Sequence, residues 1–497
     1  MTRVSVAMTA DLEERAGRHL LRDEGQEDVC LATYAPSSGP RRTTALLSAL
    51  VLPEEGERAV HGNASFRGSY VVRAAALAAR SGLGVALLHS HPDGTGWQGM
   101  SRADSATEQS YARAAETITG LPLLGMTLAG DGTWSARTWT TGRGHLDAEN
   151  VRVVGPTLRT SWNDAVRPPP TATKSQVRTV SAWGEAVQRD LSRLRVLVVG
   201  VGTVGLDVAI RLVQAGIQNV AVMDFDTVEE INLDRLLTAT RLDAKLFRSK
   251  VSIARRALRA AATASAPLIE GFDLSICEPD GERAALDYDV IFSCVDRPWP
   301  RAVLNQLAYT DLIPVIDGGL AIAPFPDSGM RNATWRTHVV VPGRPCLQCN
   351  GQIDGGQVAR DREGLFDDDN YIKRADAGAP PARENVSLLA PSVTASALAQ
   401  FVSLTVAPGG RGVPAPLRFS LATHTVEHLD VETLIGCTFE PMTGAGDQRA
   451  KLSRPHRAAE EARRERITHA RSARVQTARW AQAGLGWVTL LLNRTMK

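Results

Sequence analysis

The sequence of 497 residues is poor in cysteine and aromatic residues, carries little net charge and contains no long apolar run. Six cysteines are too few for a disulfide scaffold in a chain of this length, which indicates a reduced, cytoplasmic protein. A net charge of +2 gives the chain no general attraction to polyanions, so nucleic acid is not an expected ligand. The late run LGWVTLLL is far shorter than the roughly 20 residues of a membrane span, so we expect no transmembrane segment. The N-terminus also lacks the apolar core of a signal peptide.

The length excludes a single hydrophobic core and predicts two or three domains. Three consecutive prolines within NDAVRPPPTATKSQ mark a linker. We therefore predict domains over 1–160 and 178–445, a proline-rich linker over 161–177, and a basic helical tail over 446–497. Residues 451–497 hold eleven basic against three acidic side chains, a net charge of +8. This tail is predicted to be a solvated helix or to pack on a partner; an RNA or membrane-surface contact through its arginines, Trp480 and Trp487 is the alternative.

Hydrophobic periodicity predicts a mixed α+β fold for the first domain. Helices are expected over 10–23, 69–82 and 103–117, and strands over 27–35, 43–53, 84–92 and twice within 121–139. From Leu194 strands and helices alternate, which predicts a doubly wound, Rossmann-like parallel sheet. Its strands are expected over 194–200, 219–226, 288–296 and 313–319, with helices over 204–215 and 243–261, an irregular region over 325–390 and a buried helix over 390–406.

Two histidines lie at the end of the predicted strand 84–92. His89 and His91 are two residues apart, so their side chains point to the same face of the strand. Asp104, on the helix that follows, can supply a third ligand and leave the fourth position open for water, as catalytic zinc requires. The pattern predicts a catalytic zinc site; a metal-free domain of the same fold is the alternative.

The segments HSHP at 89–92 and SRAD at 101–104 resemble the JAMM motif of deubiquitinase-type metalloproteases. The resemblance implies a JAMM/JAB-type, cytidine deaminase-like α+β domain that hydrolyses peptide or isopeptide bonds with Zn²⁺. The spacer between His91 and Ser101 is nine residues, two more than is usual, which predicts either a loop insertion or a displaced serine. The family's residues fall here on His89, His91 and Asp104 as zinc ligands, Ser101 as oxyanion donor, and Glu27, with Glu24 as second choice, as general base.

A glycine-rich segment, VLVVGVGTVG, follows the linker and joins a predicted strand to a predicted helix. Its glycines, Gly200, Gly202 and Gly205, let the backbone approach phosphates at a helix N-terminus. Asp224 follows nineteen residues after the third glycine, which suits a ribose hydroxyl. This much fits NAD enzymes equally well. Further along the chain stand residues suited to charge on a transferring phosphate and to Mg²⁺: Asn232, Arg235, Lys250 and Asp296.

Residues 175–440 resemble the ThiF/MoeB and ubiquitin-activating family. The resemblance rests on the glycine loop, DFDTVEEINLDR, the downstream lysine and the aspartate after a strand, in matching order. It implies ATP and Mg²⁺ as cofactors and a homodimer in which an arginine reaches the partner's nucleotide. The implied roles are ribose binding for Asp224, phosphate binding for Asn232, Arg235 and Lys250, Mg²⁺ binding for Asp296, and contact with the partner's ATP for Arg178.

The cysteines separate into two groups. Cys346 and Cys349 in GRPCLQCNG match half of the family's structural zinc site, and Cys437 is a candidate third ligand with the fourth unidentified. Cys30, Cys277 and Cys294 are predicted to lie in the core. Many family members carry a nucleophilic cysteine before a segment such as SLLAPSVTASALAQ, and none stands there in this sequence. Adenylation does not require that cysteine, and a shifted or partner-supplied thiol remains an alternative for thioester formation.

Together the two resemblances imply one chain with two activities. The second domain would adenylate the C-terminal carboxylate of a ubiquitin-like or sulfur-carrier protein ending in Gly-Gly, and the first would process or remove that protein. Composite members of this kind occur in sulfur-carrier pathways and in antiphage conjugation systems, which also suggests a conjugating-enzyme-like partner. An adenylating scaffold with an inactive first domain is one alternative. An NAD-dependent oxidoreductase is the other, against which Arg235, Lys250 and Asp296 argue.

Overall fold

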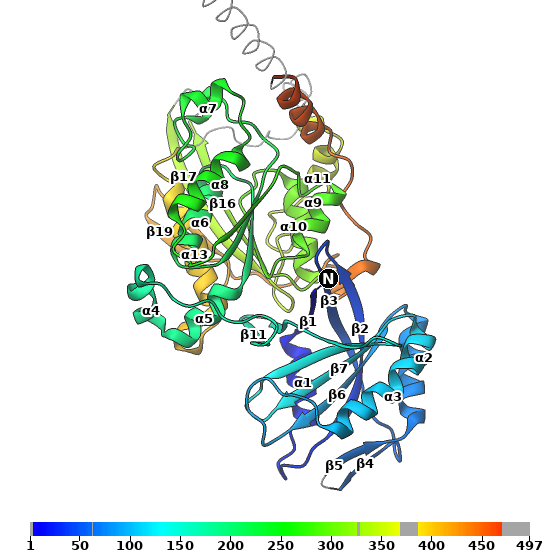
Figure 1. Ribbon diagram of the computed structural model, residues 1–497. Coiled ribbons are helices and arrows are strands. Elements are labelled where there is room, and N and C mark those ends of the chain that lie inside the picture. Colours follow the sequence, from blue (N-terminus) through cyan, green and yellow to red (C-terminus); the bar gives the residue numbers. More distant parts are fainter. Residues whose placement is uncertain (1–2, 62, 326–328, 368–385, 470–497) are drawn as a thin grey trace, which may run out of the picture.

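The computed structural model describes residues 3–61, 63–325, 329–367 and 386–469 of the chain. Two β-sheets, each covered by helices, form two domains that contact one another (Figure 1). Within the described ranges no helix is both long and apolar enough to cross a membrane. The predicted linker over 161–177 takes in the last two residues of the strand Leu158–Trp162, followed by a stretch without helix or strand up to Thr173.

The first domain is built on a nine-stranded mixed sheet in the order β11-β10-β1-β3-β2-β6-β7-β8-β9. Helix α1 (Ala10–Leu20) packs on one face of this sheet, and α2 (Gly68–Arg80) and α3 (Arg102–Thr119) pack on the other. A hairpin of β4 (Arg58–His61) and β5 (Asn63–Phe66) lies outside the sheet. The strands of the sheet are β1 (Arg3–Thr9), β2 (Val29–Ser38), β3 (Arg42–Val51), β6 (Gly84–His91), β7 (Leu123–Ala129), β8 (Trp134–Thr140), β9 (Gly144–Asp147), β10 (Asn150–Val154) and β11 (Leu158–Trp162).

Strand β2 shows why this sheet is buried on both faces. Its side chains alternate, so Cys30 and Ala32 pack with α1 while Val29 and Leu31 pack with α2 and α3. The strand is paired on both sides, antiparallel to β3 and to β6. Its neighbour β6 is thereby held at the centre of the domain, and the two histidines at the end of β6 are fixed by the most constrained part of the sheet.

The second domain has an eight-stranded sheet in the order β14-β13-β12-β15-β16-β17-β18-β19. The first five strands are parallel and the last three antiparallel, so the predicted doubly wound sheet is confirmed and extended by a hairpin region. Helices α6 (Thr203–Gln214), α8 (Lys250–Ala261) and α13 (Ala390–Thr405) cover one face, and α9 (Pro279–Ala285) and α10 (Pro298–Thr310) the other. The strands are β12 (Arg195–Val199), β13 (Asn219–Met223), β14 (Leu268–Phe272), β15 (Val290–Ser293), β16 (Val315–Pro324), β17 (Met330–Val340), β18 (Leu417–Ser420) and β19 (Thr425–His428).

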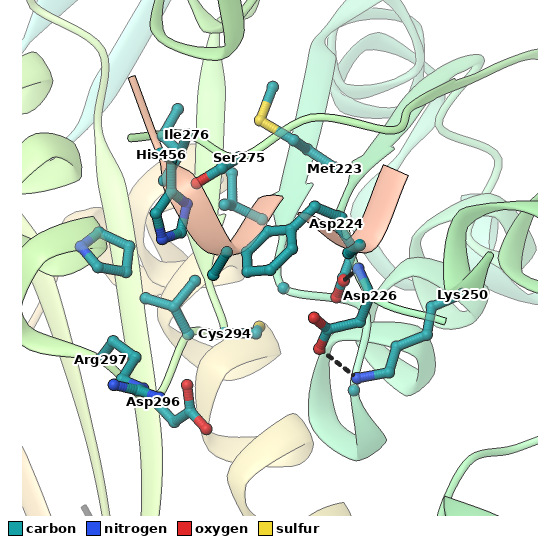
Figure 2. A pocket seen from close by; sticks show the side chains of 18 of the residues that line it. Met223, Asp224, Asp226, Lys250, Ser275, Ile276, Cys294, Asp296, Arg297 and His456 are labelled. Carbon is teal, nitrogen blue, oxygen red and sulfur yellow. Dashed lines mark hydrogen bonds and ion pairs between the residues drawn. The ribbon is translucent and has the colours of Figure 1, made fainter. Parts of the chain in front are cut away.

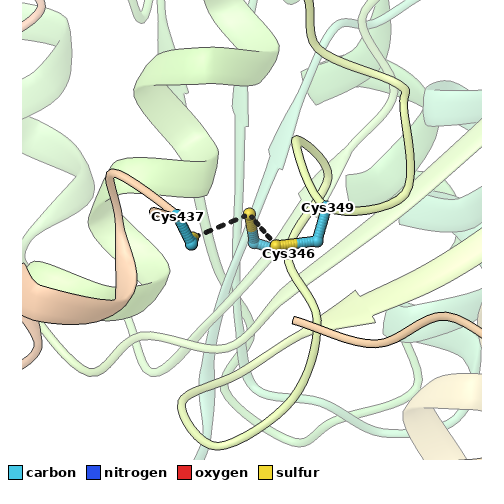
Figure 3. A group of neighbouring side chains, drawn as sticks. All are labelled: Cys346, Cys349 and Cys437. Atoms are coloured by element: carbon cyan, nitrogen blue, oxygen red, sulfur yellow. Dashed lines mark hydrogen bonds between the residues drawn. The ribbon is translucent and has the colours of Figure 1, made fainter. Parts of the chain in front are cut away.

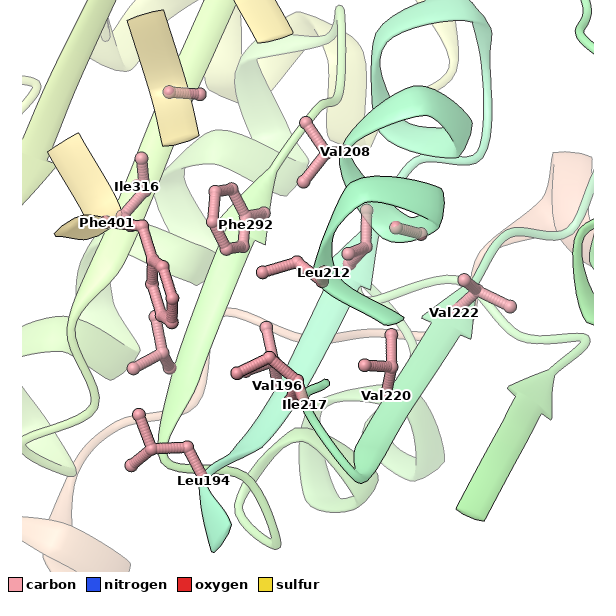
Figure 4. Close-up of a cluster of buried hydrophobic side chains, with 14 of the residues drawn as sticks. Leu194, Val196, Val208, Leu212, Ile217, Val220, Val222, Phe292, Ile316 and Phe401 are labelled. Carbon is pink, nitrogen blue, oxygen red and sulfur yellow. The ribbon is translucent and has the colours of Figure 1, made fainter. Parts of the chain in front are cut away.

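The core beneath α6 is packed from β-branched strand residues and helix leucines (Figure 4). Val196, Val220 and Phe292 come from three adjacent parallel strands and meet Leu212 of α6 and Phe401 of α13. The rings of Phe292 and Phe401 lie 5.7 Å apart. Because α6 carries the glycine loop at its beginning, this core fixes the position of the loop relative to the strand ends.

Several sequence predictions need correction. The helix predicted over 243–261 is two helices, α7 (Arg241–Lys245) and α8, because the chain turns at Phe247, whose φ of +49° is left-handed. The region predicted to be irregular over 325–390 contains β17 and α11 (Gly355–Arg362). The first helix ends at Leu20 instead of residue 23. Strand β1 and the three strands β9–β11 were not predicted.

A buried cluster of charges joins the two domains. Arg42 of β3 forms an ion pair with Asp289, which precedes β15, and Arg152 of β10 lies 3.8 Å from the same carboxylate. Arg195, at the start of β12, pairs with Glu149, and all five side chains are at most 4 % exposed. Burial raises the pKa of Asp289, but the three arginines outweigh it and hold that pKa well below its usual range. Both carboxylates therefore stay charged, and the domains are joined by ion pairs that water does not reach.

The first residues of the predicted tail, which starts at 446, pack at the junction of the two domains. Arg449 is buried and its Nη1 lies 3.1 Å from Asp311 Oδ1, while its other amino group pairs with Glu282. Asp447 accepts a hydrogen bond of 3.0 Å from the backbone N–H of Ser38 in the first domain. These residues belong to the domain junction, and the chain leaves the folded core only after them.

Candidate active sites

The carboxyl ends of β12, β13 and β15 open onto a cavity of about 610 Å³ (Figure 2). This is the place at which doubly wound sheets bind ligands, because the helices that follow neighbouring strands diverge there. The glycine loop, Asp224, Lys250 and Asp296 all line the cavity. Five residues that the sequence pattern placed in one site are therefore brought together, although they are up to 96 positions apart in the sequence: Gly200, Gly202, Asp224, Lys250 and Asp296.

The glycine loop needs its glycines at two positions. Gly200 has a φ of +87°, and a Cβ there would lie 2.5 Å from the carbonyl oxygen of Cys294. A Cβ on Gly205 would lie 1.9 Å from the carbonyl oxygen of Gly200. Strand β12 can turn into α6 only with no side chain at these points, and the turn aims the first N–H groups of α6 toward the cavity. Gly202, the residue before α6, lines the cavity itself.

Asp224 lies directly after β13 and is fixed by the backbone. Its Oδ2 accepts a hydrogen bond of 2.6 Å from the N–H of Val201, and its Oδ1 accepts one of 2.8 Å from the N–H of Asp226. Burial raises the pKa of Asp224, and the positive charge of Lys250 opposes that rise. The carboxylate keeps lone pairs free for a further donor, as a ribose hydroxyl would require.

Lys250 is the first residue of α8, where a positive charge is unfavourable because it faces the positive end of the helix dipole. Its Nζ lies 2.7 Å from Asp226 Oδ2, and its backbone N–H donates to the carbonyl of Asp226 at 3.0 Å. Burial lowers the pKa of Lys250, but Asp224 and Asp226 outweigh burial and raise it above its usual value. A charged lysine is therefore held at the cavity wall, at a helix position that helix stability does not explain.

Asp296 follows β15 on the opposite side of the cavity and is exposed to it (Figure 2). Two further carboxylates that line the cavity, Asp361 and Asp367, are paired with Arg297 at 3.3 and 2.7 Å. Carboxylate oxygens that face a cavity together with solvent are the ligands Mg²⁺ prefers. Of these three, only Asp296 is free of an ion pair in the described part of the chain.

Three residues of the predicted set lie away from this cavity. Asn232 accepts a hydrogen bond of 3.1 Å from the N–H of Glu229 and caps a short 3-10 turn. Arg235 donates to the carbonyl of Ile231 and lies 2.8 Å from Asp234. Arg178 is exposed on α4 (Val177–Trp183). None of them lines the cavity of this single chain, so any contact they make with a nucleotide requires a rearrangement or a second chain.

The first domain brings its predicted metal ligands together. His89 and His91 lie at the end of β6 with ring centroids 5.0 Å apart, and their Nε2 atoms are 3.9 and 3.6 Å from the two oxygens of Asp104. All three ligand atoms lie within 4.8 Å of one another. Burial lowers the pKa of His89 to about 3, so this ring is neutral and its nitrogen is available as a ligand. Two imidazoles and a carboxylate in this arrangement fit a zinc ion with an open position.

The structure distinguishes between the two candidate glutamates. Burial raises the pKa of Glu27, and its carboxylate lies close enough to His91 and Asp104 to interact electrostatically with both. Glu24 instead pairs with Arg22, with 3.2 Å between Oε2 and Nε. Glu27 is thus the glutamate at the histidine cluster.

Ser101 ends the long spacer and begins α3. Its Oγ accepts a hydrogen bond of 3.1 Å from the N–H of Asp104, whose Oδ2 accepts one of 2.9 Å from the N–H of Ser101. This capping box uses the serine oxygen as an acceptor and leaves its hydroxyl hydrogen free to donate. Gln98 holds the spacer in place. Its side-chain Oε1 lies 3.3 Å from His91 Nδ1, and its backbone N–H donates a hydrogen bond of 2.6 Å to Ser135 Oγ. The longer spacer is therefore an anchored loop that orients His91.

The three predicted zinc cysteines also converge (Figure 3). The Sγ atom of Cys346 lies 3.6 Å from that of Cys349 and 3.8 Å from that of Cys437. Burial raises the pKa of Cys346 to about 12, whereas that of Cys349 is lowered. In the described residues no fourth histidine, cysteine or carboxylate joins them, and His338 instead donates a hydrogen bond of 2.9 Å from Nε2 to the carbonyl of Pro345. Cys30, Cys277 and Cys294 are separate from the cluster, and burial raises the pKa of each.

Two features of the nucleotide cavity were missed from the sequence. Asp226, the second aspartate of the DFD segment, is the ion-pair partner of Lys250. A second carboxylate only two residues after Asp224 could have indicated it from the sequence. His456 also lines the cavity, although it lies in the stretch assigned to the tail. No local pattern marks this histidine, because its position depends on the path of the chain after the last strand.

The comparisons with known proteins concern the second domain, which contains the cavity at the glycine loop. The ThiF family model matches residues 173–427. The molybdopterin-synthase adenylyltransferase of Escherichia coli (strain K12) is 31 % identical over 170 residues, which cover 34 % of this chain and 63 % of the relative. The sulfur carrier protein ThiS adenylyltransferase of Bacillus subtilis (strain 168) is 29 % identical over 167 residues, 33 % of this chain and 46 % of the relative. The chain thus spans less than two thirds of the length of these curated relatives.

Among solved structures, E. coli MccB with ATP is similar at 16 % sequence identity and a TM-score of 0.41. The match covers 54 % of this chain and 74 % of that one.

Proposed function

The chain belongs to the ThiF family, and from this we propose that its second domain adenylates the C-terminal carboxylate of a small protein. The proposed substrate is a ubiquitin-like or sulfur-carrier protein ending in Gly-Gly. Support comes from the two similar enzymes, which are an adenylyltransferase for molybdopterin synthase and one for a sulfur carrier protein. The observation that carries the proposal is the meeting of the glycine loop, Lys250 and Asp296 in one cavity.

The residues of the cavity divide the work of this reaction. The substrate carboxylate attacks the α-phosphate of ATP, an acyl–phosphate bond forms, and pyrophosphate leaves with its electron pair. The N–H groups at the start of α6 bind the phosphates, and Asp224 accepts from the ribose. Lys250 carries positive charge beside the site at which charge develops on the leaving pyrophosphate, and Asp296 would hold Mg²⁺, which neutralises further phosphate charge. Nothing in this set serves hydride transfer.

Pyrophosphate exchange into ATP tests this proposal. With purified protein, Mg²⁺ and a small carrier protein ending in Gly-Gly, we expect labelled pyrophosphate to enter ATP, because the acyl-adenylate forms reversibly. Removal of the terminal glycine pair from the carrier should abolish the exchange. Absence of exchange with every Gly-Gly carrier offered, in a protein that is folded, would contradict adenylation.

We propose further that the first domain is a zinc-dependent peptidase or isopeptidase of the JAMM type. His89, His91 and Asp104 would hold the ion, and the convergence of these three side chains supports the assignment. Zinc in such a site acidifies a bound water and polarises a carbonyl. In this proposal Glu27 would act as the general base and acid that moves a proton to the leaving amine, and the free hydroxyl hydrogen of Ser101 would donate to the developing oxyanion. The bonds cut would be those at the C-terminus of the protein that the second domain activates.

The zinc content of variants tests both proposed metal sites together. We expect about two zinc ions per chain, one at the histidine cluster and one at the cysteine cluster, because each offers three ligands. His91→Ala and Cys346→Ser should each lose one ion, as measured by plasma mass spectrometry. Glu27→Gln is the matched control, since it should keep both ions yet lose cleavage of a Gly-Gly-linked fusion by about 10²-fold or more. A wild-type protein without zinc at the histidine cluster would instead support an adenylating scaffold.

A second copy of the chain would complete the adenylation site in this proposal. Arg178 is exposed on α4 and Arg235 lies outside the cavity of its own chain, which suits contacts across a homodimer. The alternative role for both is that of solvated surface residues.

A further inference from the structure

A helix over residues 457–469 (red-brown in Figure 1) contributes side chains to the lining of the nucleotide cavity. The chain approaches it along α10, where the carbonyls of Ala450 and Leu452 accept hydrogen bonds from Gln306 (2.8 Å) and Trp299 (3.1 Å). The N–H of Arg454 then donates to the carbonyl of Cys277 at 2.8 Å. The segment is therefore held to the domain before the helix begins, and its course over the cavity is not that of a free tail.

Two arginines fasten this helix to the far rim of the cavity. Both guanidinium nitrogens of Arg463 donate to the carboxylate of Glu278, at 2.9 and 2.5 Å. Arg466 lies 2.6 Å from Asp273 and also donates to the carbonyl of Phe225, the residue after Asp224. Two of the basic side chains in this stretch are thus neutralised within the chain, by ion pairs with carboxylates that follow β14.

Another face of this helix is turned toward the cavity. Ala458, Glu461, Ala462 and Glu465 all line it. Their spacing of three, four and seven residues places them on one side of a helix. Two alanines in this stripe let the helix backbone come close to whatever fills the cavity, and the two glutamates supply hydrogen-bond acceptors.

His456, just before the helix, lies at the apolar end of the cavity (Figure 2). Its ring stands edge-on to Phe225 and to Trp299, each with centroids 5.1 Å apart. Leu274 and Ile276 line the same cavity. The Nδ1 of His456 is buried without a hydrogen-bond partner in the part of the chain that is described, which is unfavourable unless a ligand satisfies it.

We propose that residues 456–469 form a cover that completes the nucleotide site, with His456 contacting the purine base. The inference rests on the proposed ATP-dependent function and assigns the two ends of its cavity. The phosphates belong at the end with the glycine loop and Lys250, because the N–H groups at the start of α6 and the positive charge of the lysine lie there. The base belongs at the end lined by Phe225, Ile276, Trp299 and His456, where aromatic rings and an unpartnered nitrogen suit a flat heterocycle.

Calorimetric titration of the full chain with ATP and with inorganic tripolyphosphate, each with Mg²⁺, tests the cover. We expect His456→Ala to bind ATP about tenfold more weakly, the size of one lost aromatic and hydrogen-bond contact, and to bind tripolyphosphate as the wild type does. The double variant Arg463→Ala, Arg466→Ala should also weaken ATP binding, because it unfastens the helix without touching the cavity wall. Arg464→Ala is the control on the same helix, since this exposed side chain makes only a 3.6 Å pair with Glu460.

Each outcome bears on a different part of the inference. Equal ATP affinity of wild type and His456→Ala would overturn the cover's contact with the base. Tighter ATP binding by the double variant would show that the helix occupies the site instead of completing it, and would overturn the proposal as well. If the wild type bound neither ATP nor tripolyphosphate, the nucleotide-dependent function itself would fail, and the cover with it.

Discussion

Replacing Lys250 with alanine is expected to lower the rate of pyrophosphate exchange by about 10²- to 10³-fold. This is the loss typical for removing one group that stabilises charge in a transition state. The lysine is held charged at the cavity wall by Asp226, at a helix position that is electrostatically unfavourable. Its removal takes away a positive charge at the cavity wall that would stabilise the leaving pyrophosphate. Exchange of labelled pyrophosphate into ATP at saturating carrier protein measures the effect.

Lys245→Ala is the matched control for this variant. It removes the same kind of side chain five residues earlier, where Lys245 is exposed on α7 and does not line the cavity. We expect its exchange rate to equal that of the wild type. Equal rates for Lys250→Ala and Lys245→Ala would show that Lys250 takes no part in the reaction. Thermal melting of both variants confirms that any loss is not one of folding.

Replacing Asp289 with alanine is expected to destabilise the protein by about 3–5 kcal/mol, the usual result of removing one partner from a buried ion pair. Asp289 neutralises Arg42 and Arg152 and accepts a hydrogen bond of 2.9 Å from the N–H of Arg195. Without it, three buried arginines share the single carboxylate of Glu149, so their positive charge is no longer balanced between the domains. Urea denaturation followed by fluorescence and by circular dichroism measures the free energy of unfolding.

An exposed ion pair provides the control for this variant. Arg418 and Glu427 lie 2.6 Å apart with half of each side chain exposed, so Arg418→Ala should cost less than about 1 kcal/mol. The pH dependence gives a second check. Because the folded pKa of Asp289 is depressed, its stabilising effect is complete above the unfolded pKa of about 4 and is lost as the pH falls below it. Asp289→Ala should therefore lose less stability on acidification than the wild type; an equal loss would contradict the role of this carboxylate.

Local sequence patterns were sufficient to predict the nucleotide loop and the histidine cluster. Gly200 and Gly205 stand where backbone geometry permits no side chain, and His89 and His91 share a face because strands have a period of two. For these residues, the spacing along the chain indicates which side chains lie on the same side. The pair Cys346 and Cys349 is marked by its short spacing, whereas Cys437 was assigned to the cluster through the family resemblance.

Other features depend on contacts between distant segments and could not be predicted from local patterns. The charges of Arg152 and Asp289 are unremarkable in sequence, and only the packing of the two sheets buries them. Strand β1 is held by parallel pairing with β3 and β10, which lie much further along the chain. His456 has no pattern around it, since its role comes from the course of the chain over α10. The turn at Phe247, which divides α7 from α8, opposes the helical propensity of its neighbours.

The buried charges between the domains also bear on how a shared substrate would move. Domains that meet through water-filled, weakly polar contacts can hinge, and one site can then deliver its product to the other. Here Arg42, Arg195 and their carboxylate partners would have to be exposed one by one for the sheets to separate. The enzyme would therefore keep its two sites at a constant separation. A carrier protein handled by both would have to leave one site and find the other by its own diffusion, so competing free carrier should be able to intercept it between the two steps.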